Sequence, residues 1–458
     1  MNSQESFKKA LSIVQQLQNG GFEAYFCGGY VRDTLLNRNP KDIDIATSAL
    51  PDQVEAIFGS NKTVQCGKNF LVCRVNVYGE DFEVATFRVE GGYKDGRHPT
   101  EVRKGTLLED AQRRDLTINA LYLNPNSNEL VDPTGQGVDD LVQGIVRFVG
   151  NPVERIREDH IRILRAIRFG SQESFELEHD SIKAIVNNVR LILASPSEAI
   201  KDELNKGFTS SNVDVGKYFD LLYLLGVFKA LIPEIDNLYG CEQTPKHHPE
   251  GDVFQHVKLM LELSKRRYKG LCVPMAWSIL MHDIAKPHTK AIDPRTGYIT
   301  NHGHAEEGEP IARRIMEDLR FDNHTIDAVC YGVKNHMKFA QAKKMKKHKL
   351  IRLLKHEHGP LLLKLHWVDC AASNGLFDNF HYSNKILAEA PQILAEPKVD
   401  KIPNIVNGKD LLDLGYKQGM TLGVMLHEIC DLYLDGEITT KEQAMDYAKK
   451  QLNKTASG

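Results

Sequence analysis

The stretch Cys27–Thr47 constrains the fold more than any other part of the chain. It reads CGGYVRDTLLNRNPKDIDIAT. The apolar run Ala24–Cys27 predicts a strand, and Tyr30–Leu36 predicts the first turns of a helix. Gly28 and Gly29 lie at the turn between them, where the missing Cβ atoms let a bulky anion approach the backbone. A strand, a glycine turn and a helix in this order therefore predict an anion site at the start of the helix.

Charged side chains near this turn extend the anion site. Arg32 can add a charged fork that holds phosphate oxygens. Asp42 and Asp44 lie two residues apart in a predicted strand, so both carboxylates face one side, about 6.6 Å apart along the strand. Carboxylates in that arrangement can converge on a hard divalent cation. A phosphate cradle beside a pair of metal ligands is the arrangement that nucleotidyl transfer needs.

These residues closely resemble the signature of the nucleotidyltransferase superfamily, which includes DNA polymerase beta, CCA-adding tRNA nucleotidyltransferases and bacterial poly(A) polymerases. The resemblance implies that Gly29 and Arg32 contact the triphosphate of a nucleotide. Gly28, which shares the turn with Gly29, belongs to the same predicted nucleotide-binding site. It also implies that Asp42 and Asp44 bind Mg²⁺.

A third carboxylate on a neighbouring strand is usual in this superfamily, and Glu83 is the candidate. It alternates with Phe82 and Val84, so it can face the site while its neighbours face the core. A glutamate that simply faces solvent is the alternative interpretation.

Length and composition limit the number of domains, the kinds of partner and the cellular compartment. A chain of 458 residues predicts two to four domains. The net charge of −3 argues neither for nor against a nucleic-acid partner. The eight cysteines, Cys66 among them, have no paired metal spacing, which fits a reducing cytosol. No apolar stretch approaches membrane-spanning length, so we expect a cytoplasmic protein without a membrane partner. The sequence does not indicate an oligomeric state.

The order of predicted elements indicates an α+β fold with four parts. Short strands and helices mix over residues 1–150, as expected for a polymerase-beta-like nucleotidyltransferase head with a small mixed sheet. Helical periodicity dominates afterwards. We expect a helical neck for nucleotide selection and RNA binding at 151–238, a helical metal-binding domain at 239–390, and a helical tail at 391–458.

Gln112–Ala120 places two arginines and an aspartate directly before a strand or short helix. Arg113 and Arg114 can hold triphosphate oxygens, and Asp115 can accept a hydrogen bond from a ribose hydroxyl. In the family it resembles, this motif recognises ribose and phosphate. Tyr93–Leu108, a glycine-containing basic loop, resembles a loop that relatives need for adding adenosine.

We expect one continuous helix over Glu154–Phe169. An apolar stripe for packing follows helical spacing at Ile156, His160, Ile163, Leu164 and Ile167. The opposite face carries Asp159, Arg162, Arg165 and Arg168, which as an ordinary surface would form salt bridges.

The pair Asp159 and Arg162 also resembles the motif with which CCA-adding enzymes select nucleotides without a template. Adenine and cytosine each present an amino donor beside a ring-nitrogen acceptor. Asp159 can only accept and Arg162 can only donate, so together they complement both bases. Uracil and guanine present the reversed pattern, which is costly. We predict nucleotide binding for Asp159, Arg162, Arg165 and Arg168.

The helical half carries a series of histidines and aspartates that resembles the HD phosphohydrolase superfamily. The resemblance implies one divalent metal bound by His256, His282, Asp283 and Asp369. It implies a second metal site that His304 and His336 complete in some members. Imidazoles with carboxylates favour a transition metal over calcium. Histidines that only cap helices are the alternative.

Together these motifs predict addition of CMP and AMP, from CTP and ATP, to the 3′ end of tRNA, with Mg²⁺ at the head and a divalent metal at the HD site. The basic runs Lys265–Lys269 and Lys343–Lys349 can meet RNA phosphates. An A-adding enzyme or a poly(A) polymerase remains an alternative. An HD phosphohydrolase with an inactive head is an alternative from another class.

Overall fold

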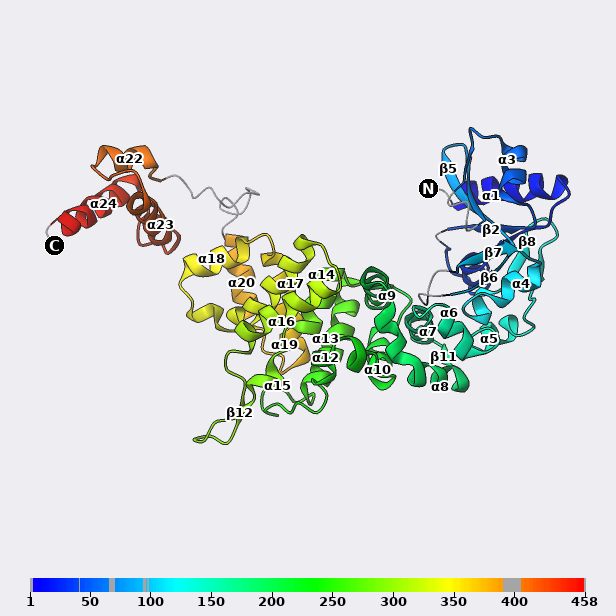
Figure 1. The fold of residues 1–458 in the computed structure, drawn as a ribbon. Coiled ribbons are helices and arrows are strands. Elements are labelled where there is room, and N and C mark those ends of the chain that lie inside the picture. The colour runs from blue at the N-terminus through cyan, green and yellow to red at the C-terminus, as the bar shows by residue number, and fades with distance from the viewer. Residues whose placement is uncertain are drawn as a thin grey trace. The chain divides into compact units, whose positions relative to one another are not determined.

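The structure is a computed structural model, and it describes residues 3–40, 42–65, 71–93, 96, 99–389 and 405–456. The chain forms two compact units, Met1–Asp236 and Asn237–Gly458 (Figure 1). Cys66, four positions of the basic loop (94, 95, 97 and 98) and the stretch 391–403 lie outside the described residues. No helix of the described residues is long and apolar enough to cross a membrane.

The first unit contains a seven-stranded sheet in the order β3-β4-β5-β2-β1-β8-β9. Its strands β2, β5 and β8 are labelled in Figure 1. Neighbouring strands in this sheet are antiparallel, except for β2 and β5, which are parallel. The sheet consists of β1 (Ala24–Cys27), β2 (Asp44–Thr47), β3 (Thr63–Gln65), β4 (Val72–Val77), β5 (Glu80–Thr86), β8 (Tyr122–Asn124) and β9 (Glu129–Val131). Three two-stranded pairs lie outside it: β6 (Arg88–Gly91) with β7 (Glu101–Lys104), β10 (Ile145–Val146) with β11 (Glu176–Leu177), and, in the second unit, β12 (Ala291–Ile292) with β13 (Ile299–Thr300).

Two predicted strands differ from those observed. The strand expected to contain both Asp42 and Asp44 begins only at Asp44, so Asp42 precedes it. The apolar residues of Ile118–Leu123 also predict a strand, and this prediction is partly wrong. The first residues of this stretch lie in the 3₁₀ turn η2, Thr117–Asn119, and β8 begins at Tyr122. The sequence pattern did not reveal this turn. Thr117, Ile118 and Asn119 are all buried, and burial alone does not distinguish a 3₁₀ turn from a strand.

The helices of the first unit pack against the sheet and then against one another. The helices are α1 (Ser3–Asn19), α2 (Gly29–Leu35), α3 (Pro51–Phe58), α4 (Leu107–Gln112), α5 (Gly137–Gln143), α6 (Pro152–Glu158), α7 (Arg162–Gly170), α8 (His179–Asn188), η3 (Val189–Ala194), α9 (Ser197–Thr209), α10 (Val215–Leu224), α11 (Val227–Leu231) and α12 (Pro233–Asp236).

The single helix predicted over Glu154–Phe169 is wrong. Helix α6 ends at Glu158, and α7 begins at Arg162. Asp159 lies between them with φ −145° and ψ 106°, which is extended backbone. The apolar stripe is nevertheless buried along its whole length, because burial of His160 and Ile161 in the connection continues it. Hydrophobic periodicity therefore located the core face but not the break.

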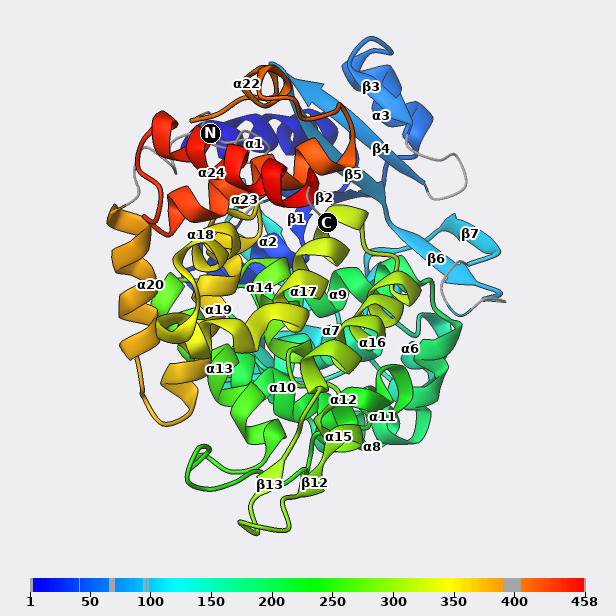
Figure 2. The same ribbon diagram turned by 90° about the vertical axis from the view of Figure 1, so that its left-hand side faces the viewer.

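The second unit is built almost entirely from helices, several of which pack side by side (Figure 2). They are α13 (Val253–Tyr268), α14 (Val273–Met281), α15 (Lys286–Thr289), α16 (His304–Asp318), α17 (Asn323–Asn335), η4 (His336–Lys344), α18 (Lys347–Lys355), α19 (Gly359–Ala372), α20 (Asp378–Glu389), α22 (Gly408–Asp413), α23 (Met420–Leu434) and α24 (Lys441–Ala456). The last three form a small core of their own around Leu411 and Ala444. The α+β fold, with a mixed sheet in the head followed by helices, is confirmed.

Candidate functional site

Strand register brings the glycine turn and the predicted carboxylates to one edge of the sheet. Cys27, the last residue of β1, lies opposite Asp44, the first residue of β2. Ile45 in turn pairs with Val84 of β5, so Glu83 lies beside Asp44 on the neighbouring strand. Because Gly28 directly follows Cys27, the turn lies close to both acidic positions, at the end of β1 and the start of β2.

A pocket of about 400 Å³ opens at this edge. It combines the glycine turn with acidic groups and five arginines, so a ligand rich in negative charge suits it. Its lining residues are Gly28, Gly29, Arg32, Asp44, Arg113, Arg114, Asp115, Asn119, Asp159, Arg162 and Arg165. Of the predicted head residues, Asp42, Glu83 and Arg168 are not among this lining.

Gly28 has a physical requirement for glycine. Its φ of 64° lies in the left-handed region, and a Cβ there would stand 3.1 Å from Nη1 of Arg114. Its amide donates to the carbonyl of Leu121, which ties the turn to the chain before β8. Gly29 then begins α2, so the start of that helix opens toward the pocket.

The head carboxylates are close enough to affect one another. Asp42, Asp44 and Glu83 are all exposed. Protein atoms around Asp44 and the negative charges of Glu83 and Asp42 raise its pKa, while Arg114 opposes the shift. A divalent cation would relieve this repulsion, so the oxygen-only donor set fits Mg²⁺ with water completing its shell. Among the described residues, however, the tightest groups of metal-ligand atoms do not include these three.

Arg113 and Arg114 are held by a buried carboxylate. Asp110 accepts from Nη2 of Arg113 at 2.6 Å and from Nη2 of Arg114 at 3.1 Å, and the Tyr122 hydroxyl donates to it at 2.6 Å. Burial works against the ionised form, but Arg114 and Arg113 outweigh it and lower the pKa of Asp110 to about 2. Glu90 adds a second contact to Arg113 at 3.2 Å. The two guanidinium groups are therefore fixed at the pocket wall.

Asp115 is already largely occupied by protein donors. Its Oδ1 accepts from the Leu116 amide and from Asn119, and its Oδ2 accepts from Arg165 at 2.7 Å. Burial opposes ionisation, yet Arg165 and Arg162 hold the pKa of Asp115 far below its usual range. Asn119 also accepts from Arg32, so a line of contacts joins the two arginines across the pocket.

Arg32 is buried, and this lowers its pKa although Asp33 counteracts the effect. Its guanidinium also lies 4.6 Å above the ring of Phe169. An anion in the pocket would therefore meet a cation that is poorly hydrated in the free protein, which strengthens the attraction.

The predicted selection residues Asp159 and Arg162 both line the pocket. Arg162 is held in place by Glu158 at 2.6 Å and by the carbonyls of Arg155 and Arg113. Asp159 accepts from the Ile161 amide at 3.1 Å, which fixes its side chain in the break between α6 and α7.

Arg168, the last of the predicted nucleotide-binding residues, contacts other side chains of the protein. It donates to Glu203 of α9 at 2.9 Å and lies 4.4 Å above Phe169. Arg168 is not among the residues that line the pocket, and its contact with a nucleotide stays a prediction.

The second unit brings together all six residues of the predicted HD site. Two groups have ligand atoms within 4.8 Å of one another: His256 with His282 and Asp369, and Asp283 with His304 and His336. Nε2 of His282 also lies 3.1 Å from Asp283, which joins the two groups. Asp283 thus lies between the two groups, because its Oδ2 contacts His282 and its Oδ1 lies 3.3 Å from Nε2 of His304.

The donors of this cluster fit a metal. His256, His282 and Asp283 are almost completely buried. Among the described residues, Nε2 of both histidines and Oδ1 of Asp283 are buried and make no hydrogen bond of good geometry, although each lies 3.1–3.3 Å from an opposite group of the cluster. Unsatisfied buried polar atoms are costly, and three that converge suit a shared cation. Imidazole nitrogens with carboxylates match a transition metal.

The histidines of this cluster differ in how readily they bind a proton. Burial opposes the charged form of His256, but Asp369 and Glu250 outweigh it and raise its pKa to about 9. Burial dominates at His336 and lowers its pKa. Metal binding would therefore displace a proton from His256.

Sequence reasoning missed several residues that shape both sites. Asn119 lies inside the motif Gln112–Ala120 and could have been found there. Asp110 and Glu158 bind arginines three or four residues away, a spacing that helical periodicity could have indicated, whereas Glu203 binds Arg168 from a distant helix. His248 and Glu250 form a third group with His256, and only the acidic residue between two histidines hinted at it.

Three family models match the chain. The poly A polymerase head domain matches residues 24–147, the probable RNA and SrmB-binding site of polymerase A matches 174–239, and the HD domain matches 253–365. The first match contains the glycine turn and the head carboxylates, and the third contains His256, His282, Asp283, His304 and His336.

Curated relatives are CCA-adding enzymes. That of Ligilactobacillus salivarius is 44% identical over 216 residues, which cover 47% of this chain and 52% of the relative. That of Geobacillus sp. (strain WCH70) is 45% identical over 205 residues, which cover 44% of this chain and 49% of the relative. The chain therefore spans about half the length of the curated relatives it matches.

Solved structures share the fold. The Bacillus stearothermophilus CCA-adding enzyme in complex with CTP has a TM-score of 0.72 and 24% identity, over 99% of each chain. The Thermotoga maritima CCA-adding enzyme complexed with tRNA has a TM-score of 0.61 and 17% identity, over 96% of this chain and 94% of that one. The chain therefore contains a segment that matches the poly A polymerase head domain and a segment that matches the HD domain, and it shares the fold of solved CCA-adding enzymes.

Proposed function

We propose that this protein adds CMP and AMP to the 3′ end of tRNA, with CTP and ATP as donors and without a nucleic-acid template. The observation that carries the proposal is the head pocket, in which a glycine turn, Asp44 and five arginines surround a volume of about 400 Å³. The CCA-adding enzymes among the relatives and structural neighbours support the same reaction.

In this proposal, the triphosphate lies against Gly28, Gly29 and Arg32, with Arg113 and Arg114 neutralising its remaining charge. Asp42 and Asp44, with Glu83 beside them, would hold Mg²⁺. When bound, Mg²⁺ activates the terminal hydroxyl of the tRNA and stabilises the leaving pyrophosphate.

The base is selected by Asp159 and Arg162. Asp159 accepts from the amino group that adenine and cytosine share, and Arg162 donates to the neighbouring ring nitrogen. Glu158 and two backbone carbonyls already orient the Arg162 guanidinium. A preset geometry of this kind favours the matching bases at little entropic cost. Arg165 acts through Asp115, which it holds at 2.7 Å.

A direct experiment tests this function. Purified protein is incubated with tRNAs that lack the last one, two or three nucleotides, and each nucleoside triphosphate is supplied singly. We expect incorporation of C and then A, and rejection of U and G. Incorporation of A alone would identify an A-adding enzyme, and long A tracts would identify a poly(A) polymerase. No incorporation, with phosphohydrolase activity retained, would leave the HD alternative.

A second proposed function rests on the six-residue cluster of the second unit. We propose that it binds a divalent transition metal and hydrolyses phosphoesters, because three buried donor atoms that make no hydrogen bond of good geometry converge there. Metal content after dialysis against Co²⁺ or Mn²⁺, with hydrolysis of 2′,3′-cyclic nucleotides as the activity, tests it. A chain that binds neither metal would contradict this proposal and leave the first one intact.

A further inference from the structure

Four histidines of the HD cluster share one orientation, with Nδ1 turned outward and Nε2 turned toward the centre. In three of them a backbone carbonyl three residues earlier accepts the hydrogen bond of Nδ1. His282 bonds Ile279 at 2.8 Å, His304 bonds Asn301 at 2.6 Å and His336 bonds Val333 at 2.7 Å. Each bond selects the tautomer that leaves Nε2 available to a metal.

These three histidines lie where the backbone leaves carbonyls available. His282 and His336 follow the last residues of α14 and α17, where the final carbonyls have no amide partner in the helix. His304 is the first residue of α16, and its acceptor lies before the helix. Helix ends therefore supply the acceptor without any side chain.

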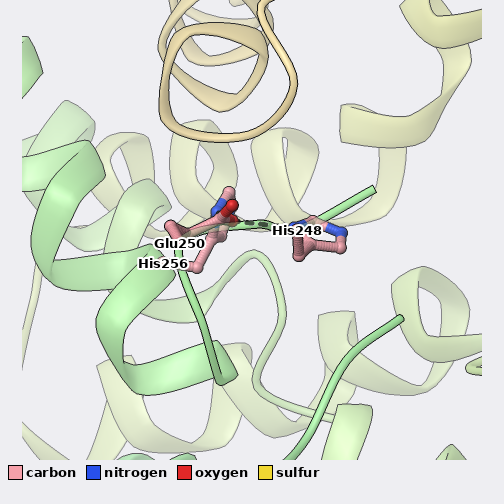
Figure 3. Close-up of side chains that lie close together, drawn as sticks. All are labelled: His248, Glu250 and His256. Carbon is pink, nitrogen blue, oxygen red and sulfur yellow. Dashed lines mark hydrogen bonds and ion pairs between the residues drawn. The ribbon is translucent and has the colours of Figure 1, made fainter. Parts of the chain in front are cut away.

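His256 has no such acceptor on its own helix. It is the fourth residue of α13, which continues to Tyr268, so the carbonyls near it accept from helix amides. A side chain from the preceding loop takes this role. Oε1 of Glu250 lies 2.6 Å from Nδ1 of His256 and 2.9 Å from Nδ1 of His248 (Figure 3). The Glu250 side chain is only 7% exposed.

We propose that Glu250 is a positioning residue for the HD metal site: it accepts the Nδ1 proton of His256 and so directs Nε2 of that histidine at the metal. The inference rests on the proposed metal binding of the cluster. His248 donates to the same oxygen from the far side and holds the carboxylate in place. Glu250 thus performs for a mid-helix histidine what backbone carbonyls perform for the other three.

A carboxylate in this position does more than a carbonyl. It makes the imidazole a stronger donor to a cation and adds negative charge to the cluster. The Lys286 ammonium, 2.7 Å from Asp283, would otherwise reduce the attraction of the site for a divalent ion. The negative charge of Glu250 therefore offsets the positive charge of the buried Lys286 near the proposed metal site.

The group of His248, Glu250 and His256 could in principle hold a metal of its own. The orientation of His256 argues against this, because a metal bound to Nδ1 would take the nitrogen whose proton fixes Nε2 toward Asp369, 3.2 Å away. Both nitrogens can bind metals at once only if the imidazole loses its second proton.

The experiment compares four variants of the full chain: Glu250→Ala, Glu250→Gln, His248→Ala and, as a matched control, Glu242→Gln. Glu242 is an exposed glutamate of the same loop that pairs with Lys290. Co²⁺ affinity is measured by competition with a chelator, together with the number of ions bound per chain and the visible absorption of the bound Co²⁺. Thermal unfolding of the metal-free proteins checks the fold.

We expect Glu250→Ala to weaken Co²⁺ binding by about 10- to 100-fold and to shift the Co²⁺ absorption band, without changing the number of ions bound. Glu250→Gln should fall between Glu250→Ala and the wild type, because its amide oxygen still accepts the Nδ1 proton but carries no charge. Glu242→Gln should match the wild type.

Three results would overturn the inference. One is wild-type affinity in a well-folded Glu250→Ala. Another is the loss of one whole ion per chain in both Glu250→Ala and His248→Ala, which would mean that this group itself binds a metal. If the wild type binds no Co²⁺, the metal site on which the inference rests fails as well, whereas the first two results leave that site standing. If Glu250→Ala does not fold, the comparison of Glu250→Gln with the control decides.

Discussion

Asp110 and Asp115 fix the guanidinium groups that line the head pocket. Each is buried, and each has its pKa held low by the arginines around it. Arginines beside a phosphate site repel one another when no phosphate is bound, so buried carboxylates are what allow Arg113, Arg114 and Arg165 to remain clustered. The arginines would therefore already be clustered, at a free-energy cost met during folding, before a nucleotide binds.

Replacing Asp110 by Asn should lower the free energy of unfolding by about 2–3 kcal/mol at pH 7, because Arg113 and Arg114 lose their shared counter-charge. The pKa of Asp110 is lower in the folded chain than in the unfolded one, so its ionised form stabilises the fold above about pH 4. That contribution disappears as the pH falls through the folded pKa of about 2.

Urea unfolding of wild type and Asp110→Asn between pH 7 and pH 2 measures this. The difference between the two proteins should shrink steadily below about pH 4. A difference that stays constant down to pH 2, or no difference at pH 7, would contradict the role given to Asp110.

Replacing Asp44 by Ala should abolish nucleotide incorporation with Mg²⁺ while leaving the unfolding temperature unchanged or raised. The side chain is exposed, and its removal relieves repulsion from Glu83 and Asp42. Single-turnover incorporation assays with calorimetry of the same sample provide the measurement. Asp81→Ala, at an exposed position on the same strand as Glu83, is the control and should retain activity. Near-normal incorporation by Asp44→Ala would refute the proposed metal ligand.

At the scale of elements, the break between α6 and α7 positions the predicted base-reading pair. In a continuous helix Asp159 and Arg162 would be a surface pair one turn apart. In the break, the extended backbone of Asp159 caps α6, and Arg162 starts α7 with its guanidinium held by Glu158. Asp159 in the break and Arg162 at the start of α7 therefore line one pocket.

Replacing Asp159 by Ala should relax the discrimination against UTP and GTP by at least 10-fold, since one acceptor is lost from the base-reading pair. Binding of the triphosphate itself should change little, because Gly29, Arg32 and the Arg113–Arg114 pair remain. The ratio of kcat/KM for CTP to that for UTP measures the effect. Glu154→Ala, an exposed change on α6, serves as control. An unchanged ratio in Asp159→Ala would exclude the template role.

At the scale of the whole molecule, the two candidate sites lie in separate compact units, Met1–Asp236 and Asn237–Gly458. The head offers carboxylate oxygens only, whereas the HD cluster offers imidazole nitrogens with carboxylates. These donor sets favour different metals, so we expect each activity to respond to its own metal.

A double variant, His282→Ala with Asp283→Ala, should lose bound transition metal and any phosphoesterase activity but still add nucleotides with Mg²⁺. Removing Asp283 also leaves Lys286 buried without its ion-pair partner, so the second unit should unfold at a lower temperature. Metal analysis, both activities and thermal unfolding are measured on one preparation. Loss of nucleotide addition as complete as in Asp44→Ala, in a folded protein, would show that the head depends on the HD metal.

The sequence by itself determined the local elements and the chemical inventory. Ala24–Cys27 and the following helix were predictable, because alternation and glycine placement act over a few residues. The HD residues were predictable as a set through the resemblance of their series to the HD phosphohydrolase superfamily. All six do come together in the structure.

Only the tertiary structure decided which groups face one another. The break at Asp159, the removal of Arg168 to Glu203, and the pairing of Asp283 with His304 and His336 all depend on contacts between distant segments. Asp110, by contrast, lies only three and four residues before its two arginines, so its contacts are local. Burying a charge is costly without a partner, so the positions of Arg168 and Asp283 follow from the partners that the fold brings near them.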